Sequence, residues 1–262
     1  MNLLPQPVVT SNALVLRTWP TGETSVIASL LTAGYGFVRV IAKAARQARS
    51  SLRPLVQPGR LIGVEISLNP RRELQYLRGG SVLLDPLATA ATLERSAYLL
   101  AALELVDRCR PAAEWQGKLF AVCEDFVRVL SCVSPGSEVS LFYAFELALL
   151  ELQGVAPALD CCAGCGIALP ASMLSGLWFS PASGGVLCRR CGVPNAGARA
   201  LSPDVLMVLR QLAAQQGEQW RAGVLHLRVV REVGIALHKF LDYHLPGYRL
   251  PRALELLRTT TQ

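Results

Sequence analysis

Two pairs of cysteines have the residue type and spacing of metal ligands. Cys162-Ala-Gly-Cys165 and Cys188-Arg-Arg-Cys191 are C-x-x-C pairs separated by 22 residues. Each pair can place its thiolates about 2.3 Å from one Zn²⁺ ion, and two pairs complete a tetrahedral site. Four thiolates leave no open position for water or substrate. The spacing therefore predicts one structural zinc ion held by Cys162, Cys165, Cys188 and Cys191.

The sequence leaves the first ligand open, because Cys161 in place of Cys162 would form a C-x-x-x-C pair. A redox-active C-x-x-C pair would need a βαβ context, which is missing from this region. The remaining cysteines stand singly in apolar helical sequence, where free cysteine behaves as a small buried hydrophobe. These residues are Cys109, Cys123 and Cys132.

The segment between the cysteine pairs predicts a small β-hairpin. Leu177–Phe179 and Gly184–Leu187 are its two arms, so residues 158–200 are expected to form a zinc ribbon. Glycine tolerates positive φ, and three glycines beside the cysteines are expected to turn the chain around the ion. They are Gly164, Gly166 and Gly192.

Basic residues concentrate in the first third of the chain. Residues 1–80 hold ten basic and three acidic groups, whereas the remaining 16 basic and 16 acidic groups cancel, so the net charge of +7 lies at the N-terminal end. No acidic residue interrupts 38–64. Such a cation cluster releases counterions from nucleic acid. We predict that DNA is bound by Arg39, Lys43, Arg46, Arg49, Arg53, Arg60, Arg71 and Arg72.

Few aromatic residues accompany these cations, which favours contacts to the DNA backbone over base readout. Trp19, Tyr35, Phe37 and Tyr76 are available for stacking on bases. A different interpretation also fits the charge: the basic surface is only solvated, or docks an acidic protein.

The sequence contains no motif typical of an enzyme. Phosphate-binding loops, dinucleotide fingerprints and nucleophile elbows are absent. The three histidines, His226, His238 and His244, lack metal-ligand spacing and are expected at the surface or at helix ends. We therefore predict a protein that is not an enzyme.

The cations must be positioned by strands. Short runs rich in Val, Ile and Leu, separated by turn residues, predict five strands in about 75 residues. That number suits an OB fold, and an SH3-like barrel fits nearly as well. The predicted strands are Ala13–Thr18, Ser25–Leu31, Phe37–Ala42, Leu61–Leu68 and Leu74–Leu77 continuing to Ser81–Leu84.

The remainder of the chain has helical periodicity. A helix capped by Ser137 is expected to end near Gly154, further helices cover Pro203–Gln215 and Ala222–His244, and residues 253–262 are expected to fray. The fold class is thus α+β. Its expected parts are an OB-fold domain at 1–85, a helical domain at 86–157 plus 201–252, and a zinc ribbon inserted at 158–200.

The chain shows neither a secretory signal nor about 18 uninterrupted apolar residues, so no membrane span is expected. A cytoplasmic protein is the default expectation.

Several segments, in this order, resemble the bacterial recombination and repair protein RecO family. The resemblance lies in Tyr35–Arg46, in Ser50–Gly59, in Leu159–Gly166, and in Phe179–Pro181 with Gly184–Cys191. It covers nearly the whole chain. The family usually has a glycine in the segment matched by Ala44-Ala45, and the four cysteines are typical of its zinc-bearing branch.

The resemblance implies a DNA repair mediator with an N-terminal OB fold. Family members bind single- and double-stranded DNA and anneal complementary strands. With RecR, and often RecF, they load RecA onto DNA coated with single-strand-binding protein (SSB). A nucleoid-associated cytoplasmic location follows from that role.

Overall fold

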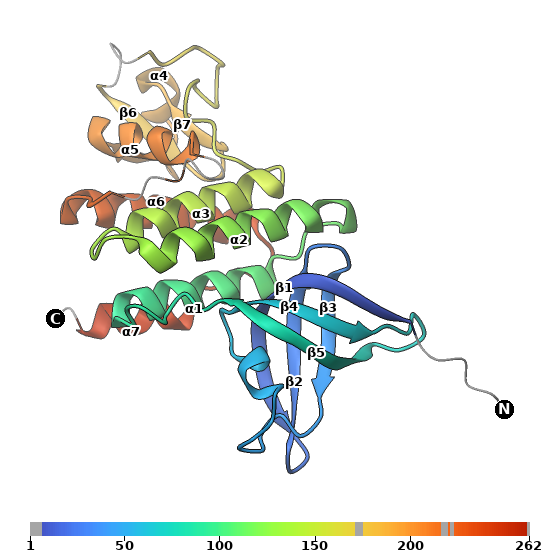
Figure 1. Cartoon of the computed structure of the whole chain (residues 1–262). Coiled ribbons are helices and arrows are strands. Elements are labelled where there is room, and N and C mark those ends of the chain that lie inside the picture. Colours follow the sequence, from blue (N-terminus) through green and yellow to red (C-terminus); the bar gives the residue numbers. More distant parts are fainter. Residues whose placement is uncertain (1–6, 171–174, 216–219, 221–222, 261–262) are drawn as a thin grey trace. The chain divides into compact units, whose positions relative to one another are not determined.

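The computed structural model describes residues 7–170, 175–215, 220 and 223–260 (Figure 1). The chain divides into two compact units. The first consists of Met1–Cys132 with Pro251–Gln262, and the second of Val133–Leu250. None of the described helices is long and apolar enough to cross a membrane.

Five strands close into a barrel in the first unit (Figure 1). They pair in the order β1-β2-β3-β5-β4, and β4 pairs with β1 to close the ring. The parallel pairing of β3 with β5 gives the five-stranded Greek-key order of an OB fold. The strands are β1 Val8–Thr21, β2 Ser25–Thr32, β3 Gly36–Ala42, β4 Leu61–Ser67 and β5 Leu74–Leu84.

Alternating side chains of these strands fill the barrel, as the period of two requires. The core includes Ala13, Val15, Leu30, Val40 and Ile66. The register of β1 against β2 shifts by one residue between Val15 and Arg17, which marks a β-bulge.

Two helices cover part of the outer barrel wall. Helix α1 (Leu93–Arg108) and helix α2 (Gln116–Cys132) pack against the first strands. Sequence analysis assigned both to the helical domain, and they lie in the same compact unit as the barrel. Leu14, Leu16 and Leu31 are buried on this covered side.

The C-terminal segment is a helix, so the predicted frayed tail is wrong. Helix α7 (Arg252–Thr260) packs along α1. The backbone N–H of Arg252 donates to Glu104 Oε2 at 3.1 Å, and Ala253 and Leu254 are buried. The apolar contact with α1 provides the stabilisation that so short a helix lacks by itself.

The loop after β3 begins with a residue in the left-handed region. Ala44 has φ +56°, which costs an L-residue about 1–2 kcal/mol. A glycine would adopt this conformation without that cost. Ala45, its neighbour, is buried in the barrel core.

We expect Ala44→Gly to stabilise the protein slightly. Relief of the strain exceeds the extra conformational freedom that glycine adds to the unfolded chain, about 0.4–1 kcal/mol. The melting temperature should therefore rise by roughly 1–3 °C. Ala45→Gly is the matched control and should lower it, because it opens a void in the core. A lower melting temperature for Ala44→Gly would contradict this account.

The second unit combines helices with a small sheet. Helices α3 (Glu138–Leu152), α5 (Pro203–Ala213) and α6 (Leu227–His244) make its apolar core. The predicted hairpin is confirmed as β6 (Leu177–Ser180) with β7 (Gly185–Leu187), and β8 (Arg199–Leu201) adds a third strand, which the sequence analysis missed. Three residues are too few for a clear alternation pattern.

The predicted helix start after Ser137 is confirmed without its capping contact, whereas the start of the last long helix differs from the prediction. Ser137 precedes α3, but its side chain makes no capping hydrogen bond, and Glu138 instead accepts from the N–H of Gly136 at 2.7 Å. Helix α6 begins at Leu227, where His226 accepts from the N–H of Arg228. The predicted start at Ala222 lies outside the described residues.

A carboxyl group is buried inside the second unit. Glu146 on α3 is fully buried, and no hydrogen bond within the described residues reaches its carboxyl oxygens. Burial raises its pKa well above the usual 4.5. His238 Nε2 lies 3.6 Å from Glu146 Oε1. His238 is thus partly exposed, with its Nε2 beside a buried carboxyl group, whereas His226 and His244 lie at the ends of α6.

The buried glutamate predicts a stability that falls as pH rises. Above pH 4.5 the unfolded chain ionises at Glu146 while the folded protein keeps the proton, so unfolding is favoured by up to about 1.4 kcal/mol per pH unit. Glu146→Gln removes this pH-dependent contribution. The free energy of unfolding of the variant, relative to that of the wild type, should therefore increase between pH 5 and 7 by up to about 1.4 kcal/mol per pH unit. Denaturant titrations at several pH values measure the free energy of unfolding of both proteins. Glu151→Gln, which changes an exposed glutamate, is the control and should show the pH dependence of the wild type. If Glu146→Gln is instead less stable than the wild type at pH 7, then Glu146 is ionised in the folded protein and forms an ion pair with His238.

Candidate functional site

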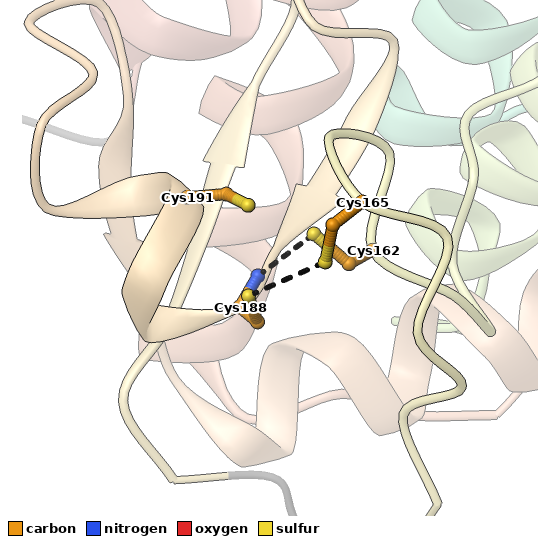
Figure 2. Close-up of side chains that lie close together, drawn as sticks. All are labelled: Cys162, Cys165, Cys188 and Cys191. Atoms are coloured by element: carbon orange, nitrogen blue, oxygen red, sulfur yellow. Dashed lines mark hydrogen bonds between the residues drawn. The ribbon is translucent and has the colours of Figure 1, made fainter.

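Four cysteine side chains meet at one end of the small sheet. The Sγ atoms of Cys162, Cys165, Cys188 and Cys191 all lie within 4.8 Å of one another. Figure 2 shows the first pair on a loop and the second at α4 (Arg189–Gly192). Four sulfur ligands around zinc lie roughly 3.8 Å apart at a Zn–S distance of about 2.3 Å. The 3.9 Å between Cys165 Sγ and Cys188 Sγ matches that spacing.

The thiol pKa values are perturbed by this crowding. Although burial raises it, the pKa of Cys162 is lowered to about 6, because N–H groups including that of Cys188 donate to its sulfur. Hydrogen bonds that the Cys191 thiol donates to the neighbouring cysteine sulfurs raise its pKa to about 12. A cation at the centre would favour the thiolate form of all four groups. The cluster is thus able to bind a metal ion.

The structure resolves which cysteine belongs to the first pair. Cys162 is buried in the cluster, whereas Cys161 is exposed and lies outside it. Among the single cysteines, Cys123 is buried as expected and Cys109 partly so. Cys132 is exposed, so the expected burial is wrong there, because it ends α2 where helical periodicity no longer places it in the core.

The glycines of the ribbon serve two different purposes. Gly166 has φ +73°, as expected for a turn, but Gly164 and Gly192 are outside the left-handed region. A Cβ on Gly192 would lie 2.4 Å from the Trp178 ring, and one on Gly164 would lie 3.3 Å from Cys191 Sγ. Close packing therefore requires glycine at position 192 and leaves little room for a side chain at 164. Periodicity in a sequence does not report such contacts.

An arginine holds the first cysteine loop. The Arg210 guanidinium, from α5, donates to the carbonyls of Leu159 and Leu169, each at 2.7 Å, and pairs with Asp160. These bonds fix both ends of the loop that carries Cys162 and Cys165. The sequence analysis missed this residue, since its partners are backbone oxygens.

The second candidate site is the basic surface of the barrel. Seven of the eight predicted cations are exposed, and they lie on β3, on the loop that follows it and on the turn before β5. Arg46 anchors the loop by donating to the carbonyl of Glu23 at 3.1 Å. The exposed seven are Arg39, Lys43, Arg46, Arg49, Arg53, Arg71 and Arg72.

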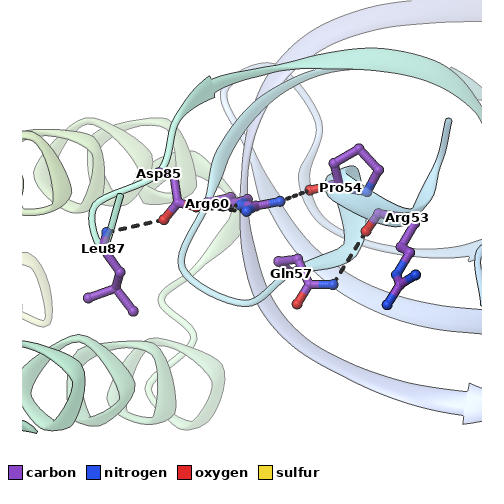
Figure 3. A network of polar contacts seen from close by, with 6 residues as sticks. All are labelled: Arg53, Pro54, Gln57, Arg60, Asp85 and Leu87. Carbon is purple, nitrogen blue, oxygen red and sulfur yellow. Dashed lines mark hydrogen bonds and ion pairs between the residues drawn. The ribbon is translucent and has the colours of Figure 1, made fainter. Parts of the chain in front are cut away.

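Arg60 differs from the others because its charge is paired. Its guanidinium contacts Asp85 Oδ2 at 2.7 Å and donates to the Pro54 carbonyl at 2.8 Å (Figure 3). Asp85 also accepts from the N–H of Leu87. This network ties the end of β5 to the 3₁₀ turn Arg53–Val56, which gives Arg60 a structural role.

Two cations on the outer barrel wall were not singled out from the sequence. Arg17 on β1 lies over Trp19, with its Cζ 5.9 Å from the ring centroid. Arg78 on β5 lies 5.5 Å from the centroid of Tyr76, and Lys43 Nζ lies 5.1 Å from the same centroid. The parallel pairing of β3 with β5, which the sequence does not state, brings Lys43 and Arg78 to the same ring.

The second unit also contains a cavity of about 520 Å³. Its floor is apolar and includes Phe179, Leu201 and Ala236. Exposed Arg199 and Lys239 contribute positive charge to its lining.

Comparison with known proteins covers both units. The family model described as recombination protein O N terminal matches residues 6–84, and the model described as recombination protein O C terminal matches residues 90–253.

Curated relatives are similar along most of their length. DNA repair protein RecO of Anaeromyxobacter is 33% identical over 90% of this chain and 91% of its own. The RecO of Desulforudis audaxviator is 31% identical over 95% of both chains, and that of Geobacter metallireducens is 29% identical over 90% and 91%. Because the two family models together match most of the chain and these relatives cover at least nine-tenths of it, the chain belongs to the RecO family of DNA repair and recombination proteins.

Proposed function

We propose that this protein is a recombination mediator that binds and anneals DNA without catalysing a reaction. It binds single- and double-stranded DNA, anneals complementary strands, and helps RecR load RecA onto SSB-coated DNA, with a functional link to RecF. It acts in the cytoplasm, at the nucleoid. The supporting observation is the set of seven exposed cations on β3, on the loop that follows it and on the turn before β5.

The cations provide the mechanism of annealing. Two complementary strands repel each other through their phosphates, and lysine and arginine side chains displace the counterions that otherwise screen them. Lys43, Arg46, Arg49 and Arg53 follow one another along a single loop. A strand bound there carries less net charge, so a second strand approaches against a smaller barrier.

The zinc ion is proposed to be structural. The four cysteines fit a tetrahedral thiolate site, which has no open position for water. Zinc is expected because four sulfur ligands at this spacing are its usual structural coordination.

The cavity of the second unit is the proposed docking site for SSB. Its apolar floor suits a hydrophobic side chain, while Arg199 and Lys239 suit the acidic residues of the SSB tail. Arg228 also lines the cavity, but its charge is paired with Glu232 at 2.9 Å. The combination of an apolar pocket with positive charge favours an acidic, partly apolar peptide over DNA.

An annealing assay with SSB-coated strands tests the whole proposal. Dye-labelled complementary strands, coated with the cognate SSB, should anneal faster with the protein present and without nucleotide. Arg199→Glu with Lys239→Glu should lose this acceleration on coated strands and keep it on bare ones. No DNA binding in any form would favour the alternative of a zinc-ribbon scaffold whose barrel docks an acidic protein.

A further inference from the structure

The small sheet of the second unit has one covered edge and one open edge. Strand β7 is covered by the chain at residues 158–163. The N–H of Val186 donates to the Ala158 carbonyl at 2.9 Å, and the N–H of Ala163 donates to the Val186 carbonyl at 2.7 Å. At the other edge, β8 pairs with β6 alone among the described residues. The outer side of β8 therefore has no strand partner in that part of the chain.

The open edge borders the cavity of about 520 Å³. Successive side chains of a strand point to opposite faces, so a strand that meets a cavity with one face lines it with every second residue. Here the consecutive residues Arg199, Ala200 and Leu201 all line the cavity. Arg199 pairs with Phe179, which also lines it, whereas Ala200 lies on the opposite face of the sheet. The backbone of β8 thus borders the cavity together with its side chains.

The opposite wall of the cavity is one face of α6. The residues of this wall recur at helical spacing and are Glu232, Ile235, Ala236 and Lys239. Ser202, which follows β8, donates to Glu232 Oε2 at 3.1 Å and ties the strand to the helix. The cavity is therefore a groove between a strand edge and a helix. An exposed sheet edge binds an extended peptide as an added strand, and pockets beside it receive alternate side chains.

The charge of the groove favours an acidic peptide. Arg199 on one wall and Lys239 on the other are exposed cations. The carboxylate of Glu232, the acidic residue of the lining, is already paired with Arg228 at 2.9 Å. The groove therefore combines two further positive charges with an apolar floor. Complementary charge steers an acidic segment to this edge and fixes its register.

We propose that an extended acidic peptide, in the proposed function the tail of SSB, binds as a fourth strand of this sheet, with its backbone hydrogen-bonded to the open edge of β8. Main-chain hydrogen bonds supply affinity in this mode of binding, and the pockets for alternate side chains supply specificity. Since β8 has three residues, the paired stretch is roughly 10 Å long.

Strand addition deepens the proposed docking of SSB and rests on it. It adds that the tail is extended when bound, because its main chain follows β8. Recognition then depends on the backbone and on the charge pattern. Sequence changes in the tail that keep its charge and an apolar residue should therefore be tolerated.

The test uses a fluorescent peptide with the sequence of the cognate SSB tail, and a series in which one backbone amide at a time is replaced by an ester. An ester lacks the N–H donor and keeps the shape of the chain. Alternate residues of an added strand direct their N–H groups to the neighbouring strand. Esters at alternate positions of the paired stretch should therefore weaken binding by roughly 2- to 10-fold each. The esters between them are the matched controls and should bind as the parent peptide does.

Hydrogen exchange on the full chain locates the pairing. The backbone amides of Arg199–Leu201 should exchange more slowly when the peptide is bound, because the open edge becomes hydrogen-bonded. The amides of β7 should exchange at an unchanged rate, since that edge is already covered.

Ile235→Glu compared with Met207→Glu tests whether the peptide lies in the groove. Both residues are exposed apolar side chains on helices, and Ile235 lines the cavity whereas Met207 lies outside its lining. Ile235→Glu adds a charge of the same sign as the peptide and should weaken binding by roughly 10-fold. Met207→Glu, the matched control, should keep the affinity of the wild type.

The outcomes separate strand addition from SSB docking. If the peptide binds and the esters weaken it nowhere, or equally at every position, side chains hold the tail and strand addition is wrong, although SSB docking stands. If the parent peptide does not bind, or if Met207→Glu weakens binding as much as Ile235→Glu does, the proposed docking site fails as well.

Discussion

Arg46→Glu combined with Arg53→Glu is expected to lower the affinity for single-stranded DNA by about 10-fold or more at physiological salt. Both side chains are exposed on the loop between β3 and β4. Each cation that no longer contacts a phosphate should reduce the slope of log affinity against log salt by about 0.7. The slope of the double variant should therefore fall by at least about 1.4.

Fluorescence anisotropy over a range of salt concentrations measures both quantities. Arg128→Glu with Arg231→Glu is the matched control, because it changes the net charge equally at exposed sites outside the barrel. If the two double variants lose the same affinity, total charge rather than the loop determines binding. Unchanged binding by the loop variant would remove the barrel as the primary DNA site.

Removal of the metal is expected to unfold the zinc ribbon before it weakens DNA binding. Structural zinc sites contribute about 10–16 kcal/mol of apparent binding free energy in small peptides, comparable with the whole stability of a domain, about 5–15 kcal/mol. Cys188→Ala with Cys191→Ala, or a strong chelator, should therefore lower the melting temperature markedly. The loop between β3 and β4, which carries Arg46 and Arg53, lies in the other compact unit. The affinity for DNA should therefore change less than the melting temperature does.

Metal analysis and thermal melts check this prediction together. The wild type should contain one zinc ion per chain, and the double variant none. Cys161→Ala supplies the matched control, since Cys161 is exposed and outside the cluster, and it should keep both metal and stability. A double variant with normal stability would show that the cluster does not support the fold.

The barrel and the ribbon were predictable because their signals are local. Alternating apolar residues define β3 and β4, and cysteine spacing predicted the four-cysteine cluster apart from the choice between Cys161 and Cys162. Pairing between distant strands was not predictable, and it decides the parallel contact of β3 with β5 and hence the choice of an OB fold over an SH3-like barrel.

The errors come from tertiary contacts that override local pattern. In the sequence Arg60 is one more cation of a basic segment, yet in the fold it forms an ion pair with Asp85, 25 residues away. The C-terminal residues have a sequence typical of a frayed end, yet α1 offers them an apolar surface. Arg210 has no recognisable motif, because its partners are carbonyl oxygens of a loop about 40–50 residues away.

The extra residue in β1 decides which chemistry the barrel presents to solvent. In a regular strand that kept the alternation of Ala13 and Val15, Arg17 would point into the core and Thr18 would point out. The irregularity at Val15/Arg17 inverts this parity, so Arg17 and Trp19 share the outer face with Ser29 and Ile27. A single inserted residue thus decides which side chains of β1 beyond it point outward. Moving it to the far side of Trp19 would place an indole and a guanidinium in the core, and the outer wall would lose a partly exposed ring and a cation without any change in composition.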